Sequence, residues 1–489
     1  MILPILLVLP LLAAAMALLR KPDHPLVARA GAALSGVTFA LALVLARRCL
    51  TRGAVAFGPG AFLRADSLSA ILTLIVSGVA CVSIGSGVNA LRHGTGENGP
   101  IDDALRRRYH VLTHLFVFTM LLAVLANNVG VMWVAVEATT ITTAFLVGVR
   151  RSKAALEASW KYILIGSVGI ALAFLGTVLG YFNFVQRVGQ TPYALHWTVL
   201  KGVAAGLDGD VLRLAFVFIL IGYGTKAGLA PMHTWLPDAH SEAPAPISAM
   251  MSGSLLAVAL YAILRWKTVV DACVGHAFTD RMLLLIGTLT VTVAATLLIR
   301  QASYKRMLAY SSVEQMGLVC VGLAFGPAGT LAALMLMIGH AAGKSMAFLL
   351  SGNLLAAYGS TRIASVRGVL RVMPWSGGLF MIAILALMGL PPFGIFLSEM
   401  LLVRAGFLSG HPWATGLVLA MVVVIFVSLL AHLQRLPYGE PPHEVPRGEP
   451  DRSSLPPLAL NLVVLLALGL VVPAPLLRLL GRAVEVVSR

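Results

Sequence analysis

The sequence predicts an all-α polytopic membrane protein, and three observations lead to that prediction. Hydrophobic residues occupy 58% of the 489 positions, charged residues occupy 11%, and the mean hydropathy is +0.90. A soluble domain carries about 25% charged residues, so this chain has too little polar surface to remain dissolved. The apolar residues also form long continuous runs, close to the ~20 residues that a helix needs to cross a bilayer.

Fourteen such runs occur, which predicts about 14 transmembrane helices. Backbone N–H and C=O groups find no water in hydrocarbon, so each run must be a helix or part of a closed barrel. Barrel strands alternate apolar and polar residues, and these runs do not. No basic segment precedes the first run, so we expect a span and not a cleaved signal peptide. The expected spans are 2–19, 26–46, 67–90, 111–129, 130–149, 160–184, 212–230, 244–264, 282–299, 308–325, 330–352, 375–400, 412–434 and 456–477.

The net charge of +16 lies mainly in the loops. Nucleic-acid binding would need a basic face on a folded soluble domain, and no soluble segment is long enough to form one. Lys and Arg are more frequent in loops after odd-numbered spans, for example at Arg106, Arg107, Arg108, Arg150 and Arg151. The positive-inside rule places such loops in the cytoplasm. We therefore expect a multi-pass protein of a prokaryotic inner membrane with both termini on the outer, periplasmic side.

The cysteine pattern argues against a redox centre held by this chain alone. The four cysteines are Cys49, Cys81, Cys273 and Cys320, and none forms a CxxC motif. Cysteine-ligated iron–sulfur clusters and structural zinc sites need closely spaced ligands. No GxGxxG follows a strand, so no nucleotide-binding fold is indicated. We expect no cofactor in this chain, and any redox chemistry in partner subunits.

Helix breakers interrupt two of the expected spans. Prolines and glycines gather at 222–237 in the seventh span and at 388–399 in the twelfth. Proline removes a backbone donor, and such breaks are tolerated at membrane depth only where the freed groups line a cavity or meet protein partners. The breaks lie five spans apart, which predicts two five-helix repeats, helices 4–8 and 9–13. An odd helix number inverts one repeat relative to the other, as in many ion-translocating proteins.

These features predict four regions along the chain. Three N-terminal helices occupy 1–110, the first half-channel repeat occupies 111–266, the inverted second repeat occupies 281–435, and a loop with the last helix occupies 436–489. The polar stretch within that last region is rich in proline and charge, and we expect a surface loop there and no separate domain.

Glu137 and Lys226 are the strongest candidates for proton transfer. Each lies within an apolar run, and Lys226 is five residues before Pro231 at the first break. An ionised group at mid-membrane costs about 2.5–3.5 kcal/mol on insertion scales. We interpret the two residues as a switchable pair, in which the carboxylate holds the lysine protonated until it moves away. A static buried salt bridge that positions helices is the alternative.

His340, Lys344 and Glu399 are the candidates in the second repeat. His340 and Lys344 are four residues apart and share a helix face, where a histidine beside a lysine can relay protons near neutral pH. The alternative is that each only bonds a nearby carbonyl. Glu399 follows Pro391 by eight residues and could exchange protons with one aqueous side. Alternatively, it is a carboxylate at a helix end that faces water.

Several further residues are weaker candidates. Glu314 lies inside the tenth span or at its mouth, and Lys305 marks the cytoplasmic end of that span or gates proton uptake. The pattern HxxxxDxHxE, formed by His233, Asp238, His240 and Glu242, could suggest a metal site. A metal needs a closed coordination shell that one broken helix rarely supplies. We therefore favour a hydrogen-bonded network that braces the break, and expect no metal.

Several motifs resemble the antiporter-like subunits of respiratory complex I, membrane-bound hydrogenases and Mrp-type cation/proton antiporters. The most specific is KAGLAPMHTWLPDAHSEAPAPISAMMSG at 226–253. Others are KRMLAYSSVEQMG, HAAGKSMAFLLSG, LPPFGIFLSE and ADSLSAIL. The resemblance covers residues 60–430. The segment VAVEATTITTAFLVG and the following helix look most like the hydrogenase-4 component F branch.

The resemblance implies roles for several residues. Glu137 and Lys226 correspond to the family's glutamate–lysine pair in the uptake half-channel, His340 and Lys344 to the central relay, and Glu399 to the exit. One departure is Ala257, which stands in the eighth span where relatives often place a lysine or histidine. The chain also ends at Arg489, so we expect it to lack the long lateral helix of some relatives.

We therefore predict a non-redox, proton-translocating membrane subunit of a complex I-like complex, of the membrane-bound [NiFe] hydrogenase (formate hydrogenlyase) type. Expected partners are other membrane subunits and a peripheral redox arm that holds the iron–sulfur and nickel–iron centres. A Mrp-type sodium/proton antiporter subunit and an antiporter-like subunit of an NADH–quinone oxidoreductase are the alternatives. A scaffold without transport activity is the structural alternative.

Overall fold

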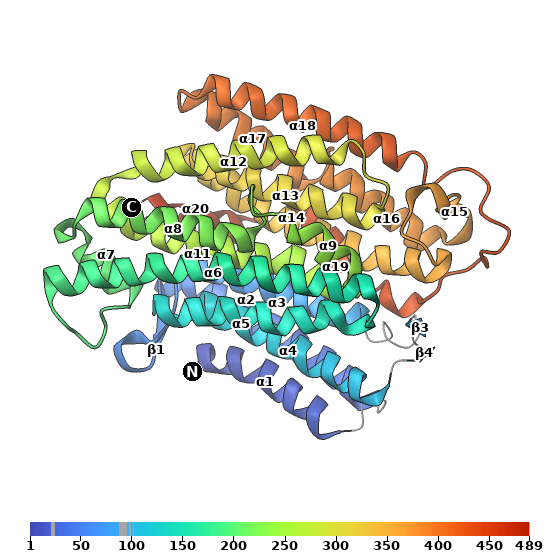
Figure 1. Cartoon of the computed structure of the whole chain (residues 1–489), viewed down its shortest axis with the longest axis horizontal. Helices are drawn as coiled ribbons and strands as arrows, with labels where there is room; N and C mark the ends of the chain where they lie inside the picture. The colour runs from blue at the N-terminus through green and yellow to red at the C-terminus, as the bar shows by residue number, and fades with distance from the viewer. Residues whose placement is uncertain (21–24, 88–94, 97–98, 101, 489) are drawn as a thin grey trace.

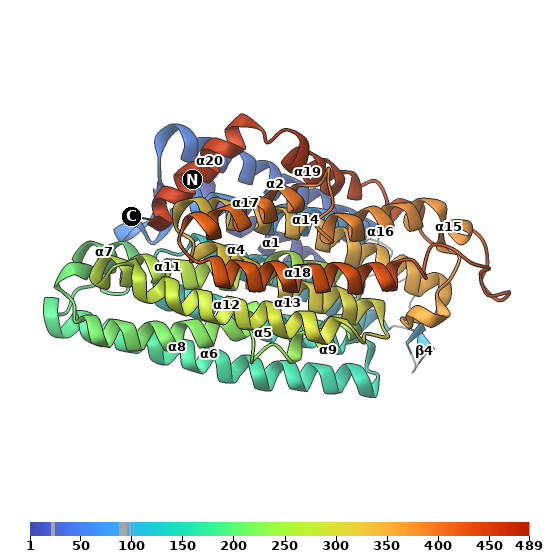
Figure 2. The same ribbon diagram turned by 90° about the horizontal axis from the view of Figure 1, so that it is seen from above.

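The structure, a computed structural model, describes residues 1–20, 25–87, 95–96, 99–100 and 102–488. Long helices run side by side along one direction of the molecule (Figure 1), and Figure 2 shows the same bundle from above. The end of the bundle that carries α7 is called here the α7 end, and the opposite end the α15 end. Both termini lie toward the α7 end (Figure 1). The all-helical membrane fold predicted above is confirmed.

The α-helices follow the expected spans with shifted bounds. They are α1 (Ile2–Leu19), α2 (Pro25–Arg52), α3 (Ser67–Ser86), α4 (Asp103–Leu125), α5 (Val129–Val147), α6 (Lys153–Val188), α7 (Trp197–Val203), α8 (Gly209–Ala227), α9 (Trp235–Glu242), α10 (Ala245–Met250), α11 (Leu256–Val274), α12 (His276–Leu298), α13 (Tyr304–Leu323), α14 (Gly326–Tyr358), α15 (Val369–Val372), α16 (Pro374–Leu387), α17 (Gly394–Leu408), α18 (Pro412–Leu433), α19 (Leu458–Leu470) and α20 (Ala474–Ser488).

Short elements connect these helices. The 3-10 turns are η1 (Pro59–Ala61), η2 (Gly148–Arg150), η3 (Ala204–Gly206), η5 (Ile363–Ser365) and η6 (Arg452–Ser454), and η4 (Met251–Leu255) is a π-helical turn. Strand β1 (Val55–Phe57) pairs with β2 (Leu63–Ala65), and β3 (Thr95–Gly96) pairs with β4 (Gly99–Pro100), both antiparallel. The end of the third expected span, 88–90, lies outside the described residues.

Within the described residues, 11 helices are long and apolar enough to cross a membrane. The other three expected spans correspond to the more polar α13 and to two interrupted pairs, α8–α9 and α16–α17. The segments α4 to α11 and α12 to α18 cover the two predicted repeats, called below the first and second repeat. Helix α4 starts at the α15 end and α12 starts at the α7 end (Figure 1), which is the relative direction that inverted repeats require, and the repeat itself stays a prediction.

The two predicted breaks occur where the prolines and glycines predict them. Helix α8 ends at Ala227, and Gly228 adopts a positive φ of 76° that suits glycine. Protein groups satisfy the freed backbone: the Ala230 N–H donates to Thr290 Oγ1 (3.0 Å), and Trp235 Nε1 donates to the Thr225 carbonyl (2.8 Å). The break is thus stable at membrane depth because neighbouring side chains replace the missing helical bonds.

The expected fourteenth span, 456–477, is wrong in one respect. Helix α19 ends at Leu470, and a second helix, α20, begins at Ala474. Pro473 and Pro475 explain the interruption, because neither can donate the backbone hydrogen bond that a continuous helix needs. Gly469 lies so close to the Pro392 carbonyl that an added Cβ would stand 1.9 Å from it. The third break therefore packs against the second.

Candidate functional site

Polar side chains from both predicted repeats, called here the polar row, lie on α5, α6, α8, α9, α13, α14 and α17. They are Glu137, Tyr162, Lys226, His240, Lys305, Glu314, Gln315, His340, Lys344 and Glu399, together with the hydroxyl groups that bond them. The most apolar stretch of α10–α11 is fully buried, and 94% of the residues in the corresponding stretch of α14 are buried. Buried polar groups are costly unless they have hydrogen-bond partners. The partners of each candidate residue therefore show what it can do.

In the first repeat, Lys226 is completely buried at the last turn of α8. Its ammonium donates to the Tyr162 hydroxyl (2.7 Å) and lies 4.7 Å from the centre of that ring. The Tyr162 hydroxyl also bonds Thr143 Oγ1 (2.7 Å). Glu137, which is half-buried on α5, accepts from Thr140 (2.9 Å) and from Ser167 (3.4 Å).

Lys226 and Glu137 are not in ion-pair contact in this structure. Lys226 faces Tyr162 of α6 and Glu137 faces hydroxyls of α5 and α6. Thr140 and Thr143 follow Glu137 at intervals of three on α5, which places all three side chains on one side of the helix. The predicted pair is therefore seen with its partners apart and a tyrosine beside the lysine, and its switching remains a prediction.

Beyond the first break, Lys305 of α13 binds the C-terminal end of α9. Its ammonium is fully buried and donates to the carbonyls of Ser241 (3.2 Å) and Ala243 (3.0 Å). A cation at a helix C-terminus is stabilised by the exposed carbonyls there. Lys305 lies in the first turn of α13, at the end of the span as expected, and it is buried there. Its role in gating stays a prediction.

The histidines and Asp238 near the break do not gather around a common point. Asp238 pairs with Arg306 and, at 3.3 Å, with Lys161. His240 is buried and stacks on Phe348 with the ring centres 5.0 Å apart, while His233 packs against Tyr310.

In the described part of the chain, no group of three or more His, Cys, Asp or Glu side chains is placed to hold a metal ion. The arrangement is a set of separate polar contacts that brace the break.

In the second repeat, Lys344 and His340 lie on one face of α14 and are both buried. Lys344 donates to the Leu308 carbonyl (2.7 Å) and to the Ser311 hydroxyl. His340 Nε2 bonds the Ser252 carbonyl (3.2 Å). Ser252 belongs to the π-helical turn η4, which changes the helical hydrogen-bonding pattern here and is typical of functional positions.

Glu314 and Glu399 are joined by one glutamine. Gln315 Nε2 donates to Glu314 Oε1 (3.1 Å) and to Glu399 Oε1 (3.3 Å). Glu314 is buried inside α13, which decides between the two positions left open by the sequence. Glu399 is half-buried, and its carboxylate lies beside Gly389 at the second break, where an added Cβ would stand 2.2 Å from Oε2.

Several residues of the polar row were not predicted as candidates from the sequence. Tyr162, Thr143, Ser252, Ser311 and Gln315 were not singled out, although each directly bonds a candidate residue or a neighbour in its network. The threonine spacing after Glu137 was the available signal. The other residues are uncharged, and a neutral polar residue in a span is common enough that no pattern marked them.

Five buried atoms of the row lack a protein hydrogen-bond partner. They are His240 Nδ1 and Nε2, His340 Nδ1, Glu314 Oε2 and Gln315 Oε1. Because buried polar atoms are nearly always bonded, these atoms mark where water can join the row. Ala257, where relatives often have a titratable residue, is buried in α11. The polar connection at this level is supplied by Ser252 and His340, with Ser252 also bonded to Ser312 (2.8 Å).

Comparisons with known proteins agree with this architecture. Residues 126–426 match the family described as NADH:quinone oxidoreductase/Mrp antiporter, transmembrane. The chain is 37% identical over 420 residues to a hydrogenase-4 component F homolog of Methylacidiphilum infernorum, covering 85% of this chain and 86% of the relative.

Two solved structures have the same fold. A chain of the archaeal membrane-bound sulfane sulfur reductase aligns with a TM-score of 0.86 at 24% identity, covering 100% of this chain and 98% of that one. A chain of respiratory complex I from Thermus thermophilus aligns with a TM-score of 0.77 at 25% identity, covering 97% and 98%.

Proposed function

The chain belongs to the NADH:quinone oxidoreductase/Mrp antiporter transmembrane family, and from that premise we propose that protons cross the membrane along its buried polar row. It is an antiporter-like membrane subunit of a complex I-like assembly. The proposal concerns which side chains carry the protons and how.

The observation that carries this proposal is the bonding of the buried lysines. Lys226 and Lys344 each donate to a hydroxyl, and no carboxylate of the described residues lies within ion-pair distance of either. An ammonium in a low-dielectric site without a counter-ion holds its proton weakly. A neutral amine can remain there at little cost, because hydroxyls and carbonyls can rearrange around it. Each lysine can thus give up and regain a proton.

We assign the steps as follows. A charge change in the neighbouring subunit moves the Glu137 carboxylate toward or away from Lys226, which alters how strongly the lysine holds its proton. The Tyr162 hydroxyl, which bonds both Lys226 and Thr143, relays that proton: its oxygen accepts the proton from Lys226 while its own hydroxyl proton passes to Thr143, which releases its own in turn. His240, His340 and Lys344 carry it through the centre with water, and Glu314, Gln315 and Glu399 lead toward the second break.

The chemistry of the row favours protons over sodium. Sodium, like other hard cations, is bound by several oxygen ligands, and the centre of this row carries Lys226, His240, His340 and Lys344 instead. Two ammonium groups would repel a metal cation. The same nitrogen groups exchange protons readily.

The relatives also suggest the setting. Because the matched relative is a hydrogenase-4 component F homolog, we propose a membrane-bound hydrogenase-type complex in which iron–sulfur and nickel–iron centres lie in partner subunits. The basic loops at the α15 end support a cytoplasmic location for that end, with the termini on the outer side.

The test is Glu137→Gln in the assembled complex, reconstituted in sealed liposomes. Hydrogen evolution, formate oxidation and quinone reduction are assayed to find the driving reaction, and a pH-sensitive dye follows the protons. Translocation should fall by about tenfold or more, because a positioned proton-transfer group contributes at least that much. Glu157→Gln is the matched control, since Glu157 is exposed and pairs only with Lys161. Unchanged proton pumping by Glu137→Gln would remove Glu137 from the mechanism.

A further inference from the structure

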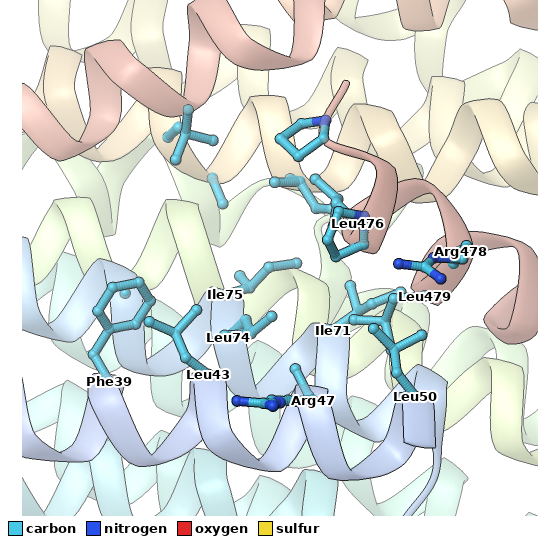
Figure 3. A pocket seen from close by; sticks show the side chains of 18 of the residues that line it. Phe39, Leu43, Arg47, Leu50, Ile71, Leu74, Ile75, Leu476, Arg478 and Leu479 are labelled. Carbon is cyan, nitrogen blue, oxygen red and sulfur yellow. The ribbon is translucent and has the colours of Figure 1, made fainter. Parts of the chain in front are cut away.

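A large pocket lies outside the polar row, between α2, α3, α14, α19 and α20. Its volume is about 870 Å³, which is at the upper end of the ~300–1,000 Å³ typical of ligand sites. Apolar side chains of α2 and α3 line it, including Phe39, Leu43, Leu50, Ile71 and Leu74 (Figure 3). The helices α2 and α19 that border it are among the least buried of the bundle.

Basic residues occupy the part of this pocket toward the α7 end. Arg47 extends from α2 and Arg478 from α20, with apolar side chains between them (Figure 3). Arg482 also lines the pocket and donates to the Cys49 carbonyl (3.1 Å) near the end of α2. Glu485 is the one acidic residue in the lining. Arg47 directly follows the expected span 26–46, so the basic part of the pocket lies near the predicted membrane boundary of α2.

We propose that this pocket binds an anionic phospholipid, with its phosphate held by Arg47 and Arg478 and its acyl chains in the apolar part. Guanidinium groups suit phosphate oxygens because they offer several donors in one plane. Basic pockets between transmembrane helices are suited to acidic headgroups. An apolar helix of another subunit would fill the space but would leave the arginines without an anion.

The position of the pocket gives the lipid a function. Its inner wall includes Ile338, Ala341 and Ala342 of α14, the helix turn that carries His340. Asn461 of α19 also lines it and donates to Ser345 of α14 (2.9 Å). Acyl chains at this wall would keep water from reaching the central relay sideways from the bilayer.

Binding is tested with the purified subunit in detergent. Delipidated protein is titrated with dioleoylphosphatidylglycerol or with dioleoylphosphatidylcholine, and native mass spectrometry and thermal unfolding record the bound lipid. Phosphatidylglycerol should bind roughly 30-fold more tightly, given the ~1 kcal/mol that each of the two arginines contributes near an acidic lipid. Inorganic phosphate alone should not stabilise the protein, since it lacks the acyl chains.

Three variants separate the contribution of the arginines to lipid binding from that of the apolar wall. The double variant R47Q/R478Q should abolish the preference for phosphatidylglycerol, and L43W should weaken both lipids because Leu43 is half-exposed at the pocket wall and tolerates a larger side chain. Arg48→Gln is the matched control, since Arg48 lies on α2 but outside the pocket.

Equal binding of the two lipids, or R47Q/R478Q behaving like R48Q, would overturn the proposal. So would a cross-link from Leu43→Cys to a helix of a neighbouring subunit in the native complex.

Discussion

The buried cations of α11 and the buried lysines of the polar row have different hydrogen-bond partners. On α11, Arg265 makes two hydrogen bonds to the Asp66 carboxylate (2.6 and 2.7 Å), a third to Ser69, and lies over the Trp197 ring. Lys267 on the same helix contacts Asp271 (2.6 Å) and Asp280 (2.7 Å). Each of these two cations has a carboxylate partner.

The lysines of the polar row have no carboxylate partner within the part of the chain that the structure describes. Lys226 bonds a tyrosine hydroxyl, Lys305 bonds two carbonyls, and Lys344 bonds a carbonyl and a serine hydroxyl. A bidentate ion pair holds its charge and its geometry, whereas an ammonium among neutral oxygens can lose its proton without leaving an unpaired anion. We infer that the bonding of a buried charge, more than its burial, distinguishes the paired cations from the lysines that are proposed to carry protons.

The largest expected effect is a loss of stability when the ion pair of Asp66 and Arg265 is broken. Asp66→Asn should lower the free energy of unfolding by about 3–5 kcal/mol, because Arg265 is left buried without an anion. Asparagine can still cap α3 as Asp66 does, so the loss reports the charge. Chemical unfolding in detergent measures it. Burial opposes ionisation of Asp66, but Arg265 holds its pKa below 3.8, so the pair persists at neutral pH and is lost only in strong acid.

Asp210→Asn is the control for this change, because Asp210 forms an exposed pair with Arg213 that contributes at most about 1 kcal/mol. Equal losses for Asp66→Asn and Asp210→Asn would contradict the structural role.

The next largest effect is a slower rate of proton translocation when Lys226 of the polar row is replaced. Lys226→Met should reduce proton translocation about tenfold or more, while the melting temperature stays within a few degrees, because an apolar side chain replaces an unpaired cation. Lys267→Met is the matched comparison and should destabilise the fold, since Asp271 and Asp280 lose their cation. If Lys226→Met pumped at the normal rate in liposomes, the chain would act as a scaffold.

A smaller effect is expected at the hydroxyl between Lys226 and Thr143. Tyr162→Phe removes the hydrogen bonds to Lys226 and to Thr143, and a loss of about 1 kcal/mol at the Lys226 bond corresponds to roughly fivefold slower translocation. The initial rate of dye quenching in liposomes checks it. Tyr181→Phe on the same helix serves as control, because Tyr181 is exposed. Equal rates for the two variants would show that protons bypass Tyr162.

The smallest effect should follow from Arg306→Gln. The pair of Arg306 with Asp238 is partly exposed, at 40% and 21% of the side chains, and such pairs contribute about 0.2–1 kcal/mol. Thermal unfolding should shift by a few degrees at most, with translocation unchanged. Loss of pumping in this variant would instead place Asp238 in the proton row.

Much of the architecture could be predicted from local sequence. Pro231 and Pro391 marked both breaks, because a missing backbone donor is a property of one residue. The burial of Lys226, His340 and Lys344 followed from the length of the apolar runs, whereas Glu137 is half-buried. Pro473 carried the same signal as the other two prolines, and the third break was missed because the expected span was placed across it.

Hydropathy and proline positions alone predicted that the chain is helical, the approximate bounds of most spans, and which ionisable residues lie within those spans. These properties depend only on short stretches of sequence. Only the tertiary structure decided the partners: Lys226 faces Tyr162 and not Glu137, and Lys305 lies under α9. Helices such as α14 are apolar on nearly every side, so no periodic pattern tells which face meets which neighbour. That choice is made by packing between residues far apart in the chain.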